Sequence, residues 1–416
     1  MSAGRAASST EDGGDRISPR IALLPSYFPG AAGSGGYGVM ANARSSASVI
    51  DLTTALPANA SALDDALADA LRRLAATDGC GELIRRNRIR GFDRDAQLGA
   101  RWLSTRLGRD LDPAQIVLTN GTQSALSLLF SALVPSGAAL VTESLTYAVL
   151  RQIGNRAGLR LRGVALDEEG MIPEALEEAF ADLPGPRILF CNPTVHNPTT
   201  AVMGIGRRQS IVDVCRRHGV AIIEDDVLGF LHRDAPPPIA AIAPDITWYC
   251  MSVSKCLAMG LRMAYLVAPS ALSAARVTEP VRRLSSWFPN SLSALIVAQW
   301  IESEAATGIA MAMAAEIAKR HQLAAEVLAD IAYVTKDGAL HIWMPLPAEL
   351  PRQAFATALE QRAVLIRPAD LFSVDDADIP NAVRISLTGP DTGAELKTGL
   401  SIVSKTFLGW SRGSAR

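Results

Sequence analysis

The chain has 416 residues, of which 49% are hydrophobic and 20% are charged, and its formal net charge is −2. These values fit a globular enzyme with two domains, or one large α/β domain with a satellite, and exclude a strongly basic nucleic-acid-binding surface. With no apolar run of membrane-spanning length, no signal-peptide core and only scattered cysteines and histidines, we expect a cytoplasmic protein. We expect no nucleic-acid partner, no membrane and no metal.

The first part of the chain is polar and rich in glycine. Residues 1–20 are rich in Ser, Gly, Asp and Arg, and we expect them to be disordered. Residues 21–60 contain further Gly and Pro and indicate an N-terminal arm with a segment of a smaller domain. From residue 61 onward the pattern changes, beginning with the helical Ala and Leu spacing of "ALDDALADALRRLAA".

Seven short apolar segments then indicate strands, and predicted helices separate most of them. They are "QIVLT" near 115, "AALVT" near 138, "LRGVAL" near 160, "RILFCN" near 187, "VAIIED" near 220, "TWYCMS" near 247 and "MAYLVA" near 263. Such segments are typical of strands buried on both faces, and their alternation with helices favours βαβ units. We therefore predict an α/β fold with a mostly parallel central sheet in a large domain, residues 61–300.

After residue 300 the order of elements changes. A long Ala-, Met- and Glu-rich helix begins near 305, strands follow near 341, 363 and 382, and a final helix is expected over 391–405. This order predicts a smaller α+β domain, residues 301–416.

Lys255 is the first lysine of a chain that has 5 lysines and 35 arginines. It follows a predicted strand, between serine and cysteine, and lysine is rarely found in apolar surroundings unless it is paired or functional. A desolvated lysine has a lowered pKa and becomes a nucleophilic amine, which a Schiff base requires. Nearby Ser252, Ser254 and Arg262 could hold a phosphate. The alternative is an ordinary surface lysine.

Polar residues also follow other predicted strands, where ligands bind in parallel sheets. Gly121, at the start of a helix in "VLTNGTQSAL", indicates an anion site, or else an ordinary turn. "AIIEDDVLGF" places Glu224, Asp225 and Asp226 at a strand end, where a carboxylate needs a partner or caps a helix.

Two further residues have alternative interpretations. Asn197 is a site residue or a turn residue, because Asn-Pro marks turns. Arg384, within a predicted strand, needs an anionic partner, which is either a substrate carboxylate or an internal acid.

Together these stretches resemble the fold-type I pyridoxal phosphate enzymes of the class I/II aminotransferase superfamily, over roughly residues 48–405. "SVSKCLAMGLR" is similar to the family pattern S-x-S-K-x-x-x-P-G-L-R, "NPTT" to N-P-T-G, and "IIEDDVLG" to the strand that ends in D-x-x-Y. "TNGTQSAL" resembles the start of the phosphate-binding helix, and "VRISL" the strand that carries the carboxylate-binding arginine.

The resemblance implies a role for each matching residue. Lys255 would be the catalytic residue and form the Schiff base with pyridoxal 5′-phosphate, and Asp225 would pair with the ring nitrogen. Asn197 would contact the ring oxygen, Tyr147 would stack on the ring, and Arg384 would bind the substrate carboxylate. The phosphate would be held by Gly121, Thr122, Gln123, Ser252, Ser254 and Arg262. Tyr37, in the arm, is a further candidate for substrate binding, and the resemblance implies a homodimer with active sites at the subunit interface.

The chain also departs from the family pattern. Leu228 replaces the tyrosine after the aspartate, Thr200 the glycine of N-P-T-G, Met259 a proline and Ala264 a glycine. Near position 86, where the family often has a tyrosine, the chain has Arg85, Arg86, Arg88 and Arg90. Arg86 could contact phosphate or substrate, or these arginines could belong to a solvated basic helix.

The resemblance favours an aminotransferase that moves an amino group from an amino acid to a 2-oxo acid. The departures leave a second possibility, a β- or γ-substitution, elimination or C–C bond-forming enzyme of specialised biosynthesis. A third possibility is a ligand-sensing regulator, since some transcription factors carry this fold behind a winged-helix domain. The first 50 residues show no helix-turn-helix pattern, so we expect an enzyme.

Overall fold

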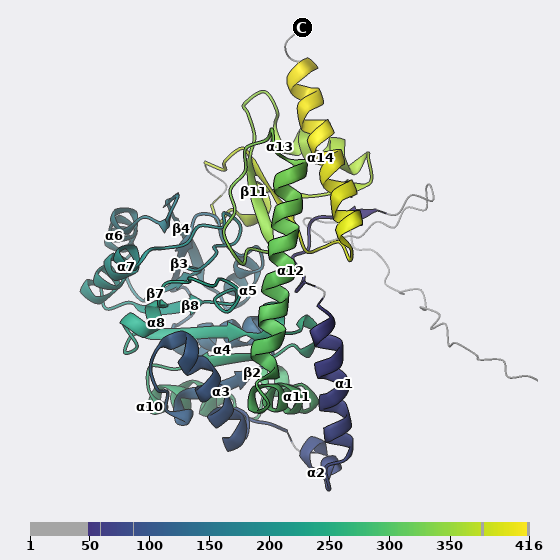
Figure 1. Ribbon diagram of the computed structural model, residues 1–416. Coiled ribbons are helices and arrows are strands. Elements are labelled where there is room, and N and C mark those ends of the chain that lie inside the picture. The colour runs from purple at the N-terminus through teal and green to yellow at the C-terminus, as the bar shows by residue number, and fades with distance from the viewer. Residues whose placement is uncertain (1–48, 59, 86, 376–377, 414–416) are drawn as a thin grey trace, which may run out of the picture. The chain divides into compact units, whose positions relative to one another are not determined.

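The computed structural model describes residues 49–58, 60–85, 87–375 and 378–413. All of them belong to one compact unit, residues 47–416 (Figure 1). In the described parts of the chain, no helix has both the length and the hydrophobicity that a bilayer crossing requires.

A seven-stranded sheet forms the centre of this unit, with the strand order β2-β10-β9-β8-β7-β3-β4. Its strands are β2 (Ile116–Thr119), β3 (Ala139–Glu143), β4 (Arg160–Val164), β7 (Arg187–Cys191), β8 (Ala221–Asp225), β9 (Thr247–Ser252) and β10 (Ala264–Val267). Only β10 is antiparallel to its neighbours in this sheet. The seven predicted strand segments are the seven strands of this sheet, which confirms the mostly parallel α/β fold.

Both faces of the sheet are buried, because successive side chains of a strand point to opposite faces. In β8, Ile223 packs in the core under α4 (Thr122–Leu133), α5 (Leu150–Arg156) and α10 (Ala271–Thr278). Ile222 packs on the other face, against α6 (Pro173–Asp182), α7 (Ile205–Arg217) and α8 (Ile239–Ile242). This two-sided burial explains why the strand sequences are nearly continuous apolar runs.

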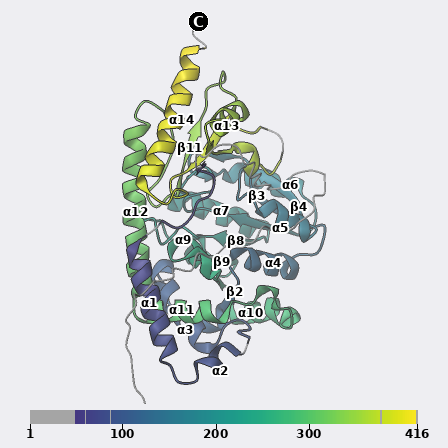
Figure 2. The same cartoon turned by 90° about the vertical axis from the view of Figure 1, so that its right-hand side faces the viewer.

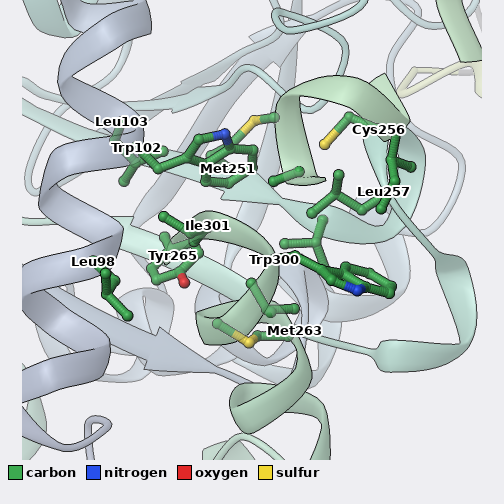
Figure 3. Packing of buried hydrophobic residues seen from close by; sticks show 14 of the residues in the cluster. Leu98, Trp102, Leu103, Met251, Cys256, Leu257, Met263, Tyr265, Trp300 and Ile301 are labelled. Atoms are coloured by element: carbon green, nitrogen blue, oxygen red, sulfur yellow. The ribbon is translucent and has the colours of Figure 1, made fainter. Parts of the chain in front are cut away.

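The helices α1 (Ser61–Ala75), α3 (Asp93–Leu107) and α11 (Ser291–Glu302) cover the sheet over β2, β10 and β9. In this core, the ring of Trp102 stacks on Phe230, with 4.4 Å between centroids, and lies 5.9 Å from Tyr265. Cys256 and Leu257, which follow Lys255, are fully buried in the same cluster (Figure 3). The turn that carries Lys255 is therefore anchored in the core.

A second, three-stranded antiparallel sheet has the order β11-β14-β13. Its strands are β11 (His341–Pro345), β13 (Arg367–Pro368) and β14 (Ala382–Ser386), and its core includes α13 (Arg352–Glu360) and α14 (Gly393–Gly413). The long helix α12 (Ala305–Val327) joins the two cores: Ile309 and Met313 pack with α1 and α11, whereas Ala324 packs beside the smaller sheet (Figures 1 and 2). The exact division into domains at residue 300 stays a prediction.

The remaining elements are short. β1 (Ile50–Asp51) pairs in parallel with β12 (Val364–Leu365), and β5 (Leu166–Asp167) pairs with β6 (Gly170–Met171). The other helical segments are α2 (Cys80–Arg85), α9 (Val253–Cys256), η1 (Pro113–Gln115), η2 (Met259–Leu261), η3 (Glu279–Val281), η4 (Ser285–Trp287) and η5 (Ala369–Phe372). Pairing of β1 with β12 brings residues 49–55 next to the C-terminal sheet, and this segment reaches the site described below.

Candidate active site

The strands β2, β3, β7, β8 and β9 all run in one direction, so their C-terminal ends lie along one edge of the sheet. The polar residues singled out from the sequence follow these ends. Glu143 ends β3, Asp225 ends β8, Ser252 ends β9, and Gly121 stands two residues after β2. This edge is where open parallel sheets bind ligands.

Lys255 lies in α9, whose N-cap Ser252 accepts a hydrogen bond from the backbone N–H of Ser254 at 3.1 Å. The Lys255 Nζ donates to the backbone carbonyl of Ala55. Burial, together with the positive charges of Arg384 and Arg262, lowers the pKa of Lys255 to about 8, against an opposing effect of Asp225. About one tenth of this amine is therefore uncharged at pH 7, far more than for an ordinary lysine, and the uncharged form is the nucleophile.

The three consecutive acids at the end of β8 have different partners. Glu224 caps α8 by accepting from the backbone N–H groups of Ile239 and Ala240, each at 2.8 Å. Asp226 pairs with Arg106 at 2.9 Å and accepts from the hydroxyl of Tyr249 at 2.9 Å. The capping interpretation thus applies to Glu224, whereas Asp226 belongs to an internal ion pair.

Asp225 is the acid that remains available to a ligand. Its side chain is 6% exposed, and its Oδ1 has no hydrogen-bond partner among the described residues. Burial, followed by the negative charge of Asp226, raises the pKa of Asp225 to about 7. A buried carboxyl oxygen of this kind suits a protonated ring nitrogen, which would supply both the charge and the hydrogen bond.

Gly121 and Arg262 lie next to each other at the predicted phosphate site. Gly121 has a φ of 81° and is the N-cap of α4, so the first N–H groups of that helix, at Thr122 and Gln123, follow it directly. A Cβ at Gly121 would lie 3.3 Å from Nη2 of Arg262. Arg262 itself has a φ of 45°, unusual for a residue with a side chain. A helix N-terminus beside a guanidinium is an arrangement that can bind a phosphate.

Arg384 and Asn197 are directly connected. Nη1 of Arg384 donates to Oδ1 of Asn197 at 2.9 Å, and the Arg384 guanidinium lies 4.9 Å from the ring centroid of Phe372. The hydroxyl of Tyr147 accepts a hydrogen bond from Nε2 of Gln123 at 2.9 Å. These contacts hold the side chains that the resemblance assigns to ring and substrate.

Asn192 links several of these groups, although the sequence showed it only as a polar residue at a strand end and assigned it no role. Its backbone N–H donates to Glu143 at 2.8 Å, its side-chain Nδ2 donates to the Asp225 carbonyl at 2.5 Å, and its Oδ1 accepts from the Asn197 backbone at 2.9 Å. Its position directly after a buried strand was the available signal. Thr53, whose carbonyl accepts from Arg384, gave no such signal.

Two predicted contacts, Tyr37 and Arg86, lie outside the described residues. The neighbouring arginines have other partners. Arg88 is 2% exposed, pairs with Asp95 and stacks on Phe92, while Arg85 pairs with Glu82 at 2.8 Å. These contacts show a buried ion pair and a surface pair, in place of a uniformly solvated basic helix.

The departures from the family pattern have visible consequences. Leu228 is 5% exposed and packs in the core with Trp102, so its apolar side chain serves packing where the pattern has a hydroxyl. Thr200 has a φ of 64°, a backbone conformation that favours glycine and is strained for a β-branched residue. This conformation explains the glycine in the pattern and shows that the backbone turn is kept without it.

Comparison with known proteins places these features in a family. The family model of aminotransferase class I and II matches residues 54–397. The 2-aminoadipate transaminase of Thermus thermophilus is 26% identical over 299 residues, covering 69% of this chain and 72% of that protein. A crystal structure of an archaeal alanine:glyoxylate aminotransferase superposes with a TM-score of 0.80 at 19% identity, covering 88% of this chain and 92% of that one.

Other relatives are named as regulators. The uncharacterized HTH-type transcriptional regulator YdeF of Bacillus subtilis is 26% identical over 306 residues, which cover 73% of this chain. The chain spans 58% to 65% of the length of this protein and two similarly named regulators.

The family match indicates pyridoxal 5′-phosphate as the cofactor. The described residues fit it: Asp225 offers a buried, unpartnered oxygen, and Gly121 leaves space beside Arg262 that a Cβ would fill.

Proposed function

Because the chain belongs to the aminotransferase class I and II family, we propose that it transfers an amino group from an amino acid to a 2-oxo acid. The observation that carries this proposal is the amine of Lys255. It has a lowered pKa and lies within the electrostatic reach of both Asp225 and Arg384. An amine that loses its proton readily, near an acid that would bind the ring and an arginine that would bind the carboxylate, is the arrangement that amino transfer requires.

When bound, pyridoxal phosphate supplies an aldehyde that condenses with amines and a protonated ring that accepts electrons from the substrate Cα–H bond. Asp225 would hold that ring protonated at nitrogen, and the amide of Asn197 would face the ring oxygen. Gly121, Ser254 and Arg262 would hold the phosphate, with Thr122, Gln123 and Ser252 beside them. Tyr147 would pack against the ring face.

Lys255 and Arg384 would then have different roles toward the substrate. The guanidinium of Arg384 binds the α-carboxylate and fixes the position of Cα. The Nζ of Lys255 would accept the Cα proton and deliver it to the carbon that the cofactor's aldehyde supplies, because a base with a pKa of about 8 exchanges protons readily near neutral pH. After burial, the positive charge of Arg384 is the next cause that lowers the pKa of the Lys255 amine.

We also propose that the protein works as a homodimer in the cytoplasm. Support comes from large apolar side chains that are exposed on the neighbouring helices α1, α2, α11 and α12. Leu71 is 43% exposed, Ile84 52%, Leu292 44% and Met311 68%. Exposed large apolar side chains on helices that pack together are a common feature of protein interfaces. Sedimentation equilibrium tests it, and a Met311→Glu variant is expected to shift the protein toward a monomer.

A second candidate function is ligand sensing, which the three regulator-named relatives favour. A third is elimination or substitution chemistry, favoured by the apolar side chain of Leu228, which offers no hydroxyl near the ring. Both would use the same cofactor and the same lysine. They differ from amino transfer because they do not convert the cofactor to pyridoxamine 5′-phosphate.

The test is single-turnover amino transfer by the purified protein loaded with cofactor. A set of L-amino acids is added without a 2-oxo acid, and conversion of the cofactor to pyridoxamine 5′-phosphate is followed by chromatography. We expect conversion by the wild type and none by Lys255→Arg, because a guanidinium stays protonated and cannot replace the amine. Lys319→Arg, at an exposed lysine outside the site, is the matched control.

Exchange of the Cα proton into deuterated water without formation of pyridoxamine 5′-phosphate would contradict amino transfer and favour elimination or substitution. Specific DNA binding without turnover would favour the regulator.

A further inference from the structure

One face of the C-terminal sheet carries polar side chains that contact the candidate active site. His341 of β11 is the register partner of Ser386 in β14, and Ser386 stands two residues after Arg384. Opposed residues on neighbouring strands, like residues two apart on one strand, point to the same face of a sheet. Nη1 of Arg384 donates to Asn197, and Oγ of Ser386 donates to the Thr54 carbonyl at 2.9 Å. His341 therefore lies on the face that meets the site, although the proposed function gives it no role.

The imidazole of His341 is buried against the turn that contains Asn197. The residue is 2% exposed, and its Nε2 lies 3.0 Å from the backbone carbonyl oxygen of Pro198. Since a carbonyl only accepts hydrogen bonds, Nε2 carries the proton and is the donor. Burial, followed by the positive charge of Arg384, holds the pKa of His341 well below its ordinary value. The ring is thus a neutral donor at neutral pH, and its Nδ1 has no hydrogen-bond partner among the described residues.

This contact fixes the backbone on one side of Asn197. The proline ring restricts φ of residue 198, so a fixed Pro198 carbonyl leaves the preceding residue little freedom. On the other side, the backbone N–H of Asn197 donates to Oδ1 of Asn192 at 2.9 Å. Asn197 is consequently held from the central sheet by Asn192 and from the C-terminal sheet by His341.

The direction of the Asn197 amide gives this support a consequence. Its Oδ1 accepts from Arg384 at 2.9 Å, so its Nδ2 is the group that would donate to the ring oxygen of the cofactor. A hydrogen bond weakens steeply when its donor moves out of line or out of range. The bond from His341 to the neighbouring Pro198 carbonyl limits such movement, and it does not involve the side chain that would bind the substrate carboxylate.

We propose that His341 is a positioning residue: its Nε2–H holds the Pro198 carbonyl and thereby keeps the Asn197 amide in place to donate to the ring oxygen of pyridoxal phosphate. This inference rests on the proposed function for the role of Asn197, and it extends that function to the C-terminal sheet. The alternative is that His341 only fastens the turn to that sheet, in which case its loss changes stability and leaves the cofactor unaffected.

The absorbance of the bound cofactor separates the two roles. It changes with pH as the Schiff base formed with Lys255 loses the proton that it shares with the ring oxygen. A donor to that oxygen favours the negative charge on it, and this lowers the pH at which the proton leaves. In the loaded protein, His341→Met removes the Nε2–H. We expect the midpoint of the absorbance titration to rise by about 0.5 pH unit, which is part of the shift that loss of one hydrogen bond to the oxygen produces.

Two further variants and a control make this result specific. His341→Gln, whose amide reaches about as far as Nε2, should restore the wild-type midpoint. His341→Asn, whose shorter amide stops at the position of Nδ1, should shift the midpoint as His341→Met does, and it replaces His341→Met if that variant does not fold. His321→Met is the matched control, because Nε2 of this half-buried histidine also lies 2.8 Å from a backbone carbonyl, that of Ala339. It should lower the stability in urea denaturation and leave the midpoint unchanged.

A double-mutant cycle with Asn197→Ala shows whether His341 acts through Asn197. Asn197→Ala alone should raise the midpoint, and the addition of His341→Met should raise it no further. The role of His341 would be overturned by an unchanged midpoint in His341→Asn or in Asn197→Ala, by equal shifts in His341→Met and His321→Met, or by fully additive shifts in the double variant.

Single-turnover amino transfer tells a failure of this inference from a failure of the proposed function. Conversion of the cofactor to pyridoxamine 5′-phosphate, together with a midpoint that does not depend on His341, keeps amino transfer and overturns the role of His341. Absence of conversion with every amino acid, together with a midpoint that depends on both His341 and Asn197, does the reverse.

Discussion

Replacing Asp225 by asparagine is expected to stabilise the cofactor-free protein at alkaline pH while it removes the activity of the loaded protein. The carboxyl is 6% exposed, its Oδ1 has no hydrogen-bond partner among the described residues, and burial raises its pKa to about 7 from an ordinary value of 3.8. Each pKa unit corresponds to about 1.4 kcal/mol, so the ionised form costs the folded state about 4 kcal/mol.

The sign of the pH dependence follows from these two pKa values. Between about pH 4 and pH 7 the folded protein retains a proton that the unfolded chain has lost, so this group lowers stability as the pH rises. Above pH 7 both states are ionised and the cost is constant. The advantage of Asp225→Asn should therefore grow by about 2 to 3 kcal/mol between pH 5 and pH 8. The buried amide N–H groups of the variant reduce its net advantage by about 1 to 3 kcal/mol at every pH.

Urea denaturation of the two cofactor-free proteins, followed by circular dichroism at several pH values, measures this difference. Asp226→Asn is the matched control, because it removes the charge from a carboxyl that Arg106 and Tyr249 already satisfy. It should destabilise the protein by about 3 to 5 kcal/mol, since a buried arginine loses its partner. A stability difference between Asp225→Asn and the wild type that does not change with pH would refute the reasoning.

Three further results are expected. Gly99→Ala should lower the free energy of unfolding by about 1 to 3 kcal/mol in thermal or urea denaturation, because the added Cβ would lie 2.4 Å from Cε1 of the buried Tyr265; an unchanged midpoint would contradict this packing. Asn192→Ala removes two side-chain hydrogen bonds at the sheet edge and should weaken cofactor binding roughly tenfold in equilibrium dialysis. A change in stability without a change in cofactor binding would show that Asn192 has a purely structural role. In the cofactor-free protein, the rate of Lys255 acetylation, measured by mass spectrometry, should titrate with a midpoint near pH 8. Arg384→Met should raise that midpoint because it removes a neighbouring positive charge, and an unchanged midpoint would show that burial alone sets the pKa.

The sequence by itself determined the strands of the central sheet and the chemistry at their ends. Strands that are buried on both faces have nearly continuous apolar sequences, so all seven strands could be predicted from short segments of the chain. Lys255 stood out for a similarly local reason, because imine chemistry requires an amine that arginine cannot supply. Gly121 was predicted because it stands two residues after such a strand, and Asn197 because of its Asn-Pro sequence and the family resemblance; the roles of both stay predictions.

The family resemblance assigned Asp225 to the ring nitrogen, but only the tertiary structure shows why the two neighbouring acids at the end of β8 are not available. Glu224 accepts from the backbone at the start of α8, and Asp226 pairs with Arg106, and both partners are distant along the chain. The contact of His341 with the Pro198 carbonyl likewise depends on the packing of the C-terminal sheet against the turn after β7. Contacts between segments so far apart in sequence leave no local pattern, because the partner of a polar group is fixed by packing and not by its neighbours along the chain.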